Sequence, residues 1–242
     1  MSPLVDFPKA DRPLERPTRV ISLDLDDTLW PVMPVLAAAE IALLSWLRER
    51  HPRAAKGHDV DSMRKARQRI AMRFPEQSHD LTFVRRHALG EQFRAAGYAD
   101  AHAADSPAAE ALEVFLTARN RVELYADVRP ALLRLRANHR LFAVSNGNAD
   151  LVRCGISELF DGHITPAHAG AAKPDARIYQ HLLCSAGVES GEVLHIGDDP
   201  LADVVGATRA GIRAVWLNRN NRTWPAEYAP PARTASTLAE II

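Results

Sequence analysis

Short runs of apolar residues, rich in β-branched side chains, recur along the chain and predict the strands of a buried sheet. The first run, Val20, Ile21 and Leu23, is followed at once by an acidic cluster. Three further runs lie at 141–144, 193–196 and 214–217. Segments of helical period alternate with them, near 130–138, 149–156, 175–186 and 201–210. This alternation is typical of βαβ units and predicts a parallel α/β sheet flanked by helices.

A long stretch between the first and second strands has no strand pattern. Apolar residues from Pro34 to Arg121 recur at helical spacing, as in Leu36, Leu43 and Leu47. The stretch is broken at 51–52, 74–75, 97 and 106–107, which predicts about four helices. We therefore expect a flexible segment over 1–18, an α/β core over 19–30 and 122–242, and an all-helical insertion over 31–121.

The composition excludes some classes of protein but does not identify a binding partner. The 242 residues carry thirty basic and thirty acidic side chains, and the formal net charge is zero. No global field therefore draws the chain to nucleic acid or to an anionic membrane, and neither is predicted as a partner. No apolar run approaches the roughly 20 residues of a membrane span, and the two cysteines lack metal-ligand spacing. We expect a soluble, cytoplasmic protein with reduced thiols; the oligomeric state is not predicted.

Four polar clusters lie at or near the ends of the predicted strands, where open α/β sheets carry their sites. Asp24 and Asp26 follow the first strand, and their carboxylates suit a hard cation or the roles of nucleophile and proton donor. Ser145 and Asn146 follow the second strand, at a turn that forms an anion cradle. The other two clusters are Lys173, before a helix, and the acids Asp198, Asp199 and Asp203 after a later strand.

Each cluster has an ordinary alternative when taken alone. Acids cap helices, Ser and Asn form turns, and a single lysine is usually exposed to solvent. For no site to exist, all four ordinary readings must hold at once. The order of the clusters along the chain therefore carries more weight than any one of them.

The four clusters, written DLDDTLW, VSNGN, KPD and LHIGDDPLADVVGA, resemble the motifs of the haloacid dehalogenase superfamily of phosphatases. The resemblance covers 19–29 and about 127–217 and implies a Rossmann-like sheet with an inserted helical cap. More narrowly, the motifs together with the arginine-rich helical stretch are similar to bacterial phosphatases of flavin mononucleotide (FMN) and of ribitylaminouracil phosphate. The implied substrate is a small phosphorylated metabolite.

The resemblance also implies roles for individual residues. Asp24 is the implied nucleophile that forms an aspartyl phosphate, and Asp26 is the implied general acid and base. Thr28 supports the loop, while Ser145, the amide of Asn146 and Lys173 hold the phosphate. The implied cofactor is Mg²⁺, held by Asp24, the backbone carbonyl of Asp26 and Asp198, with Asp203 or Asp199 completing or orienting the shell.

Two other activities share parts of this pattern. A receiver-like signalling domain also has an acidic pocket, a phospho-accepting aspartate, a hydroxyl and a lysine, but its chain order differs and it has no helical insertion. A metal-independent haloacid dehalogenase shares the nucleophile but lacks a second aspartate, which is present here as Asp26. The presence of that second aspartate favours phosphate over halide chemistry.

Further residues outside the motifs have alternative interpretations. The basic run over 64–73 is a solvated helix face, a nucleic-acid surface or a means of steering anionic substrate. Arg85 and Arg86 contact a leaving group or are surface charges, and Trp30 stacks on a flat leaving group or packs the hinge of the insertion. His195, inside a predicted strand, is expected to be a satisfied core histidine.

Overall fold

Six parallel strands form one sheet in the order β3-β2-β1-β4-β5-β6. This computed structural model describes residues 17–99, 103 and 105–241, so most of the segment 1–18 expected to be flexible lies outside the described residues. The strands are β1 (Val20–Leu23), β2 (Arg140–Val144), β3 (Gly162–Ile164), β4 (Val193–Gly197), β5 (Arg213–Leu217) and β6 (Thr234–Ala235). The predicted parallel α/β sheet is confirmed, and β3 and β6 are two short strands that the sequence pattern did not indicate.

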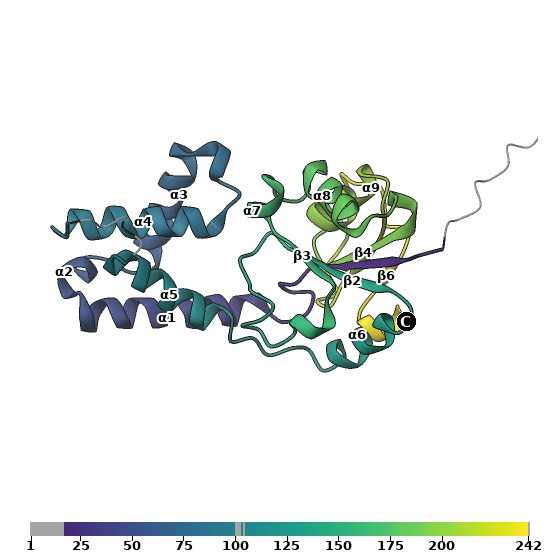
Figure 1. Ribbon diagram of the computed structural model, residues 1–242, viewed down its shortest axis with the longest axis horizontal. Helices are drawn as coiled ribbons and strands as arrows, with labels where there is room; N and C mark the ends of the chain where they lie inside the picture. The colour runs from purple at the N-terminus through teal and green to yellow at the C-terminus, as the bar shows by residue number, and fades with distance from the viewer. Residues whose placement is uncertain (1–16, 100–102, 104, 242) are drawn as a thin grey trace, which may run out of the picture.

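Alternate residues of the central strands enter two different cores, one on each face of the sheet. In β2, Leu141 and Ala143 pack in the core beneath α6 (Val128–Arg136), whereas Phe142 and Val144 pack in the core beneath α8 (Ala176–Ala186). Figure 1 shows α6 on one side of the sheet and α8 and α9 (Gly206–Arg209) on the other. Burial on both faces explains why these strands are continuous apolar runs rather than alternating ones.

The insertion forms a second helical unit at one end of the molecule (Figure 1). Its helices are α1 (Val32–Arg50), α2 (Pro52–Ala55), α3 (Val60–Arg73), α4 (Leu81–Ala95) and α5 (Pro107–Arg119). All the expected breaks coincide with helix ends, and one more falls before α3, where Asp59 caps the helix by accepting from the amide of Ser62 at 2.8 Å. None of the described helices is both long and apolar enough to cross a membrane.

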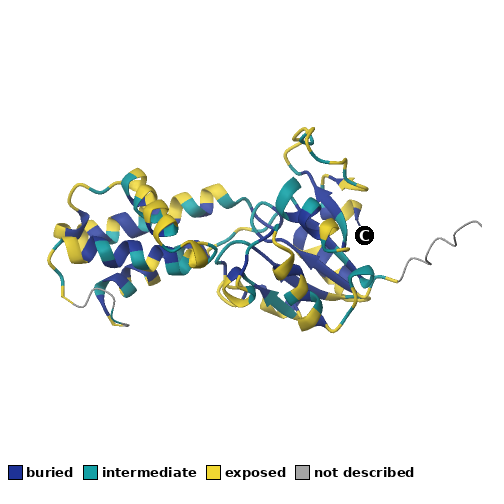
Figure 2. Cartoon of the chain, turned by 90° about the horizontal axis from the view of Figure 1, so that it is seen from above, coloured by how far each residue is buried: buried dark blue, intermediate teal, exposed yellow. Residues whose placement is uncertain are grey.

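The helical unit has its own apolar core, seen as buried inner faces and exposed outer faces in Figure 2. Leu43 and Leu47 of α1 pack there with Phe115 of α5, and α1 and α5 lie side by side. At the junction, Val35 of α1 instead belongs to the core of the sheet. The division of the chain at 30/31 and 121/122 stays a prediction, and we propose it as the boundary of a cap.

One expected helix is wrong. The segment 149–156 forms a single turn, closed by the amide of Cys154 donating to the carbonyl of Asp150 at 2.8 Å. Gly155 follows with a positive φ of 69°, a left-handed conformation that ends the turn. The expected helix near 201–210 is present as a π-helical segment, Pro200–Val205, that continues into α9.

Candidate active site

Asp24 lies directly beyond β1, at the carboxyl edge of the sheet. Its backbone amide donates to the carbonyl of Ile196 at 2.9 Å, so the β1–β4 pairing fixes its position. The residue is 7% exposed. Beyond it the chain turns back through Asp27, whose φ of 57° is left-handed, and Thr28 donates towards Asp198 at 3.5 Å. The first and last of the four clusters are therefore adjacent in space.

Lys173 brings a buried ammonium group to this edge. Its Nζ donates to Oδ1 of Asp24 at 2.6 Å, to Oδ1 of Asp203 at 2.6 Å and to the carbonyl of Val144 at 2.7 Å. The three N–H bonds of an ammonium are thus all used. Burial works against its charge, but Asp203 and Asp24 outweigh burial and raise the pKa of Lys173. The lysine is therefore charged and fixed beside the predicted nucleophile.

Asp203 joins this lysine to a buried histidine. Nε2 of His195 lies 3.1 Å from Oδ1 of Asp203, and Nδ1 lies 2.8 Å from Oγ of Ser22. Burial lowers the pKa of His195, so the contact is a hydrogen bond from a neutral imidazole rather than an ion pair. Nε2 then carries the proton and Nδ1 accepts from the serine. The expected satisfied core histidine is what the structure contains.

Three carboxylates gather at the same place. Asp24, Asp198 and Asp203 each offer an oxygen, and these oxygens lie within 4.8 Å of one another. Burial raises the pKa of Asp24, Lys173 lowers it, and the charges of Asp203 and Asp198 raise it again. The net result is a raised pKa of Asp24. Burial and Asp203 likewise raise the pKa of Asp198 to about 7. A set of hard oxygen donors whose negative charges repel one another suits a divalent cation such as Mg²⁺.

Asp203 and Asp199, between which the sequence did not decide, have different environments. Asp203 is 1% exposed, and its pKa is lowered because Lys173 and His195 outweigh the effect of burial. Asp199 is exposed and caps the π-helical segment, accepting from the amides of Leu201 at 2.9 Å and Ala202 at 2.7 Å. The packing therefore groups Asp203 with the acids and gives Asp199 a helix-capping contact.

The loop after β2 lies beside Lys173. The side chain of Asn146 accepts from the Lys173 amide at 2.7 Å and donates to the Lys173 carbonyl at 2.9 Å. Oγ of Ser145 accepts from the amide of Gly147 at 2.9 Å. The second and third clusters are thus joined, and the Asn146 side chain has a structural contact that the sequence did not indicate.

The side chain of Asp26 is not part of the acidic group and has other partners. Its Oδ1 accepts from Nε1 of Trp30 at 2.9 Å, and both of its oxygens accept from Nη2 of Arg119, at 2.8 and 2.6 Å. Trp30 is fully buried, so it packs the hinge and does not offer a face to a flat leaving group. Arg119, from α5, is a residue that the sequence analysis missed, because no spacing links it to the motifs.

A cleft of about 630 Å³ runs between the two units. The helical unit contributes its wall through residues 79–82, before and at the start of α4, and the core contributes the loops after β2 and β3. Asn148 and Thr82 meet across it, with Nδ2 of the first 3.3 Å from Oγ1 of the second. Gly147 lines both this cleft and the Ser145 loop, so the cleft opens beside the candidate phosphate cradle.

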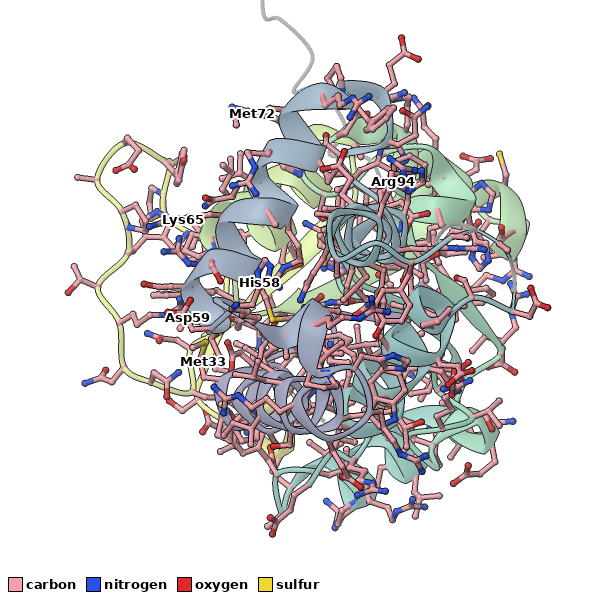
Figure 3. The ribbon with its side chains drawn as sticks, turned by 90° about the vertical axis from the view of Figure 1, so that its left-hand side faces the viewer. Met33, His58, Asp59, Lys65, Met72 and Arg94 are labelled. Carbon is pink, nitrogen blue, oxygen red and sulfur yellow. The ribbon has the colours of Figure 1, made fainter. Side chains whose placement is uncertain are left out.

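The arginines of the helical unit have other partners. Arg85 is buried and donates to both oxygens of Glu40, at 3.2 and 2.8 Å. In this structure it is therefore not available for the contact with a leaving group that the sequence suggested. Arg86 lines a separate cavity with Arg73 and Arg94. In the run over 64–73, Arg67 pairs with Glu40 at 3.0 Å, whereas Figure 3 shows Lys65 projecting outward from α3. The run is mainly a solvated helix face.

Comparison with known proteins identifies the family. The model of the haloacid dehalogenase-like hydrolases matches residues 18–211. The chain is 30% identical over 223 residues to the 5-amino-6-(5-phospho-D-ribitylamino)uracil phosphatase YigB of Escherichia coli, covering 90% of this chain and 92% of that one. It is 34% identical over 148 residues to a phosphoserine phosphatase of Thermus thermophilus, covering 59% of each chain.

A solved structure supports the same family assignment. The crystal structure described as a 2-haloacid dehalogenase from Pseudomonas syringae matches with a TM-score of 0.86 and 33% identity, covering 93% of this chain and 96% of that one. The predicted superfamily, fold class and phosphatase-type enzyme are confirmed by these comparisons. The chain belongs to the haloacid dehalogenase-like hydrolase family.

Proposed function

We propose that the chain is a phosphomonoester hydrolase that acts through an aspartyl phosphate on Asp24. One observation carries the proposal: the buried ammonium of Lys173 lies 2.6 Å from Asp24, next to the loop that holds Ser145. A fixed cation beside a carboxylate nucleophile stabilises the negative charge of a transferring phosphoryl group. We assign Ser145 and the amide of Asn146 to hydrogen bonds with the phosphate, and Lys173 to the phosphate through its positive charge, because its three N–H bonds are already used.

The proposed reaction has two steps. A carboxylate oxygen of Asp24 forms a bond to phosphorus while the bond from phosphorus to the ester oxygen breaks, and the departing oxygen takes a proton from Asp26. Water then attacks phosphorus, returning a proton to Asp26, while the bond to Asp24 breaks and its electron pair returns to the carboxylate. The products are an alcohol and inorganic phosphate. Thr28 lies in the loop that follows the two aspartates, and its hydroxyl links this loop to Asp198.

The acidic group fits a magnesium ion. Asp24, Asp198 and Asp203 would hold it, with the backbone carbonyl of Asp26 as a further ligand and Asp199 outside the group. When bound, the ion supplies positive charge beside the phosphate oxygens. Its charge also favours the ionised form of Asp24, which the nucleophilic role needs and which burial disfavours.

The leaving group belongs in the cleft between the two units. Its volume of about 630 Å³ falls within the range of roughly 300–1,000 Å³ of small-molecule sites. The similarity to a ribitylaminouracil phosphate phosphatase supports that phosphate as the substrate. FMN, which only the resemblance of the sequence motifs implies, is the second candidate. Both are small phosphorylated metabolites that join a polyol to a flat ring.

The test is a panel of phosphorylated metabolites with magnesium, measured as phosphate release. We expect turnover of at least one of the two named substrates, and Asp24→Asn should abolish it while leaving the fold intact. Activity retained by Asp24→Asn would show that the nucleophile is wrong. A protein that accepts one phosphate and holds it, rather than releasing it repeatedly, would instead be receiver-like.

A second candidate activity rests on the dehalogenase similarity. The Pseudomonas syringae structure is 33% identical and carries that description. Chloroacetate and 2-chloropropionate, assayed for halide release without magnesium, form the competing arm of the panel. Halide release together with inert phosphate esters would replace the phosphatase proposal.

A further inference from the structure

Arg119 joins the helical unit to the loop that carries Asp26. It is the last residue of α5, is 1% exposed, and lies 93 positions from Asp26 in the chain. Its Nη2 lies 2.8 Å from Oδ1 and 2.6 Å from Oδ2 of Asp26. Trp30 donates to Oδ1 from the hinge at 2.9 Å. The direction of the Asp26 carboxylate is therefore set by two groups that belong to neither the acidic cluster nor Lys173.

The pair lies against the candidate phosphate loop. A Cβ at Gly147 would lie 2.5 Å from Oδ2 of Asp26, 3.1 Å from Nη2 of Arg119 and 3.3 Å from Oγ of Ser145. Asp26 and Arg119 thus occupy the space that a side chain at position 147 would fill. This contact places the Asp26 carboxylate beside the loop assigned to the substrate phosphate, where a proton donor for the ester oxygen is needed.

The arrangement is costly for the fold. Nη1 of Arg119 is buried and has no hydrogen-bond partner among the residues that the structure describes. A buried guanidinium nitrogen without an acceptor loses the hydrogen bonds that water gives it, and such groups call for a functional explanation. Arg119 is therefore poorly explained by stability alone.

We propose that Arg119 is a positioning residue that directs Asp26 to the ester oxygen of the substrate. This inference rests on the proposed function, since it assigns Asp26 as the acid and base of that reaction. Arg119 does not contact the substrate; it acts from α5 by fixing the Asp26 carboxylate against Gly147. Because α5 belongs to the helical unit, the placement of the acid depends on the placement of that unit over the core.

The test compares esters that differ in their need for a proton. In para-nitrophenyl phosphate the leaving oxygen departs as a stable phenolate, whereas in glycerol phosphate it departs as an alkoxide unless it is protonated. The value of kcat/KM is read for both esters because it reports the step in which that bond breaks. Arg119→Gln, Arg119→Lys and the exposed neighbour Arg121→Gln are compared with the wild type.

General acid catalysis contributes about 10²–10⁴-fold, so Arg119→Gln should lose about a hundredfold on glycerol phosphate. The loss on para-nitrophenyl phosphate should be a few-fold, Arg119→Lys should recover part of the activity, and Arg121→Gln should match the wild type. Equal losses on both esters, no loss on either, or a gain on glycerol phosphate would overturn the positioning role.

A second variant covers the case in which Arg119→Gln does not fold. Gly147→Ala keeps Arg119 but displaces the Asp26 carboxylate, and it should show the same selective loss on the alkyl ester. Asp26→Asn separates the two levels of the argument. If Asp26→Asn shows the selective loss but Arg119→Gln and Gly147→Ala do not, only the role of Arg119 fails. If the wild type cleaves no phosphate ester, the proposed function fails instead.

Discussion

Nε2 of His195 lies 3.1 Å from Oδ1 of Asp203, inside the sheet and away from solvent. The histidine is in turn held by Ser22, whose Oγ lies 2.8 Å from Nδ1. Through Asp203, the same contacts reach Lys173 and Asp24. Ser22, within β1, is therefore linked to the lysine through His195 and Asp203.

Ser22→Ala should destabilise the protein and slow catalysis. The substitution leaves Nδ1 of His195 buried without a donor, which costs about 1–3 kcal/mol. We expect the free energy of unfolding, measured in urea, to fall by this amount. We also expect kcat to fall several-fold with little change in KM, because the substrate contacts stay in place. An unchanged kcat in a destabilised variant would show that the contact serves the fold alone.

Magnesium should stabilise the protein, and more so above neutral pH. Because the pKa of Asp198 is raised to about 7, protons compete for the site below that pH. At about a hundred times Kd, magnesium should add about 2.7 kcal/mol to the free energy of unfolding. Thermal melts with magnesium or EDTA from pH 6 to 8 would measure this.

The Asp198→Asn variant provides the control. It removes one carboxylate from the group of three and should abolish most of the magnesium-dependent shift in Tm. The exposed Asp199, replaced by asparagine, should retain the shift, since asparagine still caps the helix. A shift that survives Asp198→Asn but not Asp199→Asn would reverse our assignment of the ligands.

The sequence predicted the residues of the four motifs, including Lys173 before a helix, and missed Arg119, which lies outside them. Asp24 and Asp198 end buried apolar runs, so their meeting follows from the rule that parallel strands end at one edge. Arg119 lies at the end of a helix packed by Phe115, and nothing in the periodicity of that helix marks it. Its role comes from a contact across 93 residues, which only the packing of the two units brings about.

The same contrast holds in the fold. The strands β1, β2, β4 and β5 are four or five residues long and mostly apolar, and their periodicity was visible. The edge strands β3 and β6 have three and two residues, too few for a pattern. They form because an exposed sheet edge supplies hydrogen-bond partners, which is a property of the assembled sheet.

His163 should destabilise the protein increasingly as the pH falls from about 6.5 to 4, against opposite contributions from Asp24 and Asp198, whose raised pKa values favour the folded form in acid. His163 lines the cleft, and burial, with a smaller effect of His168, lowers its pKa to about 4. The unfolded chain takes up a proton below its ordinary pKa, near 6.5, while the folded protein does not, so acid favours unfolding. The slope reaches at most about 1.4 kcal/mol for each pH unit and is smaller near both ends of the range, so His163 alone lowers the free energy of unfolding by about 2–3 kcal/mol.

Unfolding in urea at several pH values would isolate this contribution. The free energy of unfolding of His163→Gln should rise relative to that of the wild type as the pH falls from 6.5 to 4. His168→Gln should show a smaller change in the same direction, because it removes only the smaller cause. If the free energies of unfolding of the wild type and His163→Gln changed in parallel over that range, His163 would not be a group that couples stability to pH.

Glu40→Leu should destabilise the helical unit, and a second substitution should largely restore it. Glu40 is buried between Arg85 and Arg67, and its Oε1 lies 2.8 Å from Nη2 of Arg85 and 3.0 Å from Nη2 of Arg67. Arg85 also lies 3.3 Å from the centre of the Phe115 ring. Removing the carboxylate leaves Arg85 charged and buried, at a cost of about 3–5 kcal/mol. Replacing Arg85 by methionine as well removes the stranded charge and fills the space with an apolar side chain. Urea unfolding of the two single variants and the double variant should therefore show a double variant more stable than Glu40→Leu; additive losses would mean that the pair is not coupled in the folded protein.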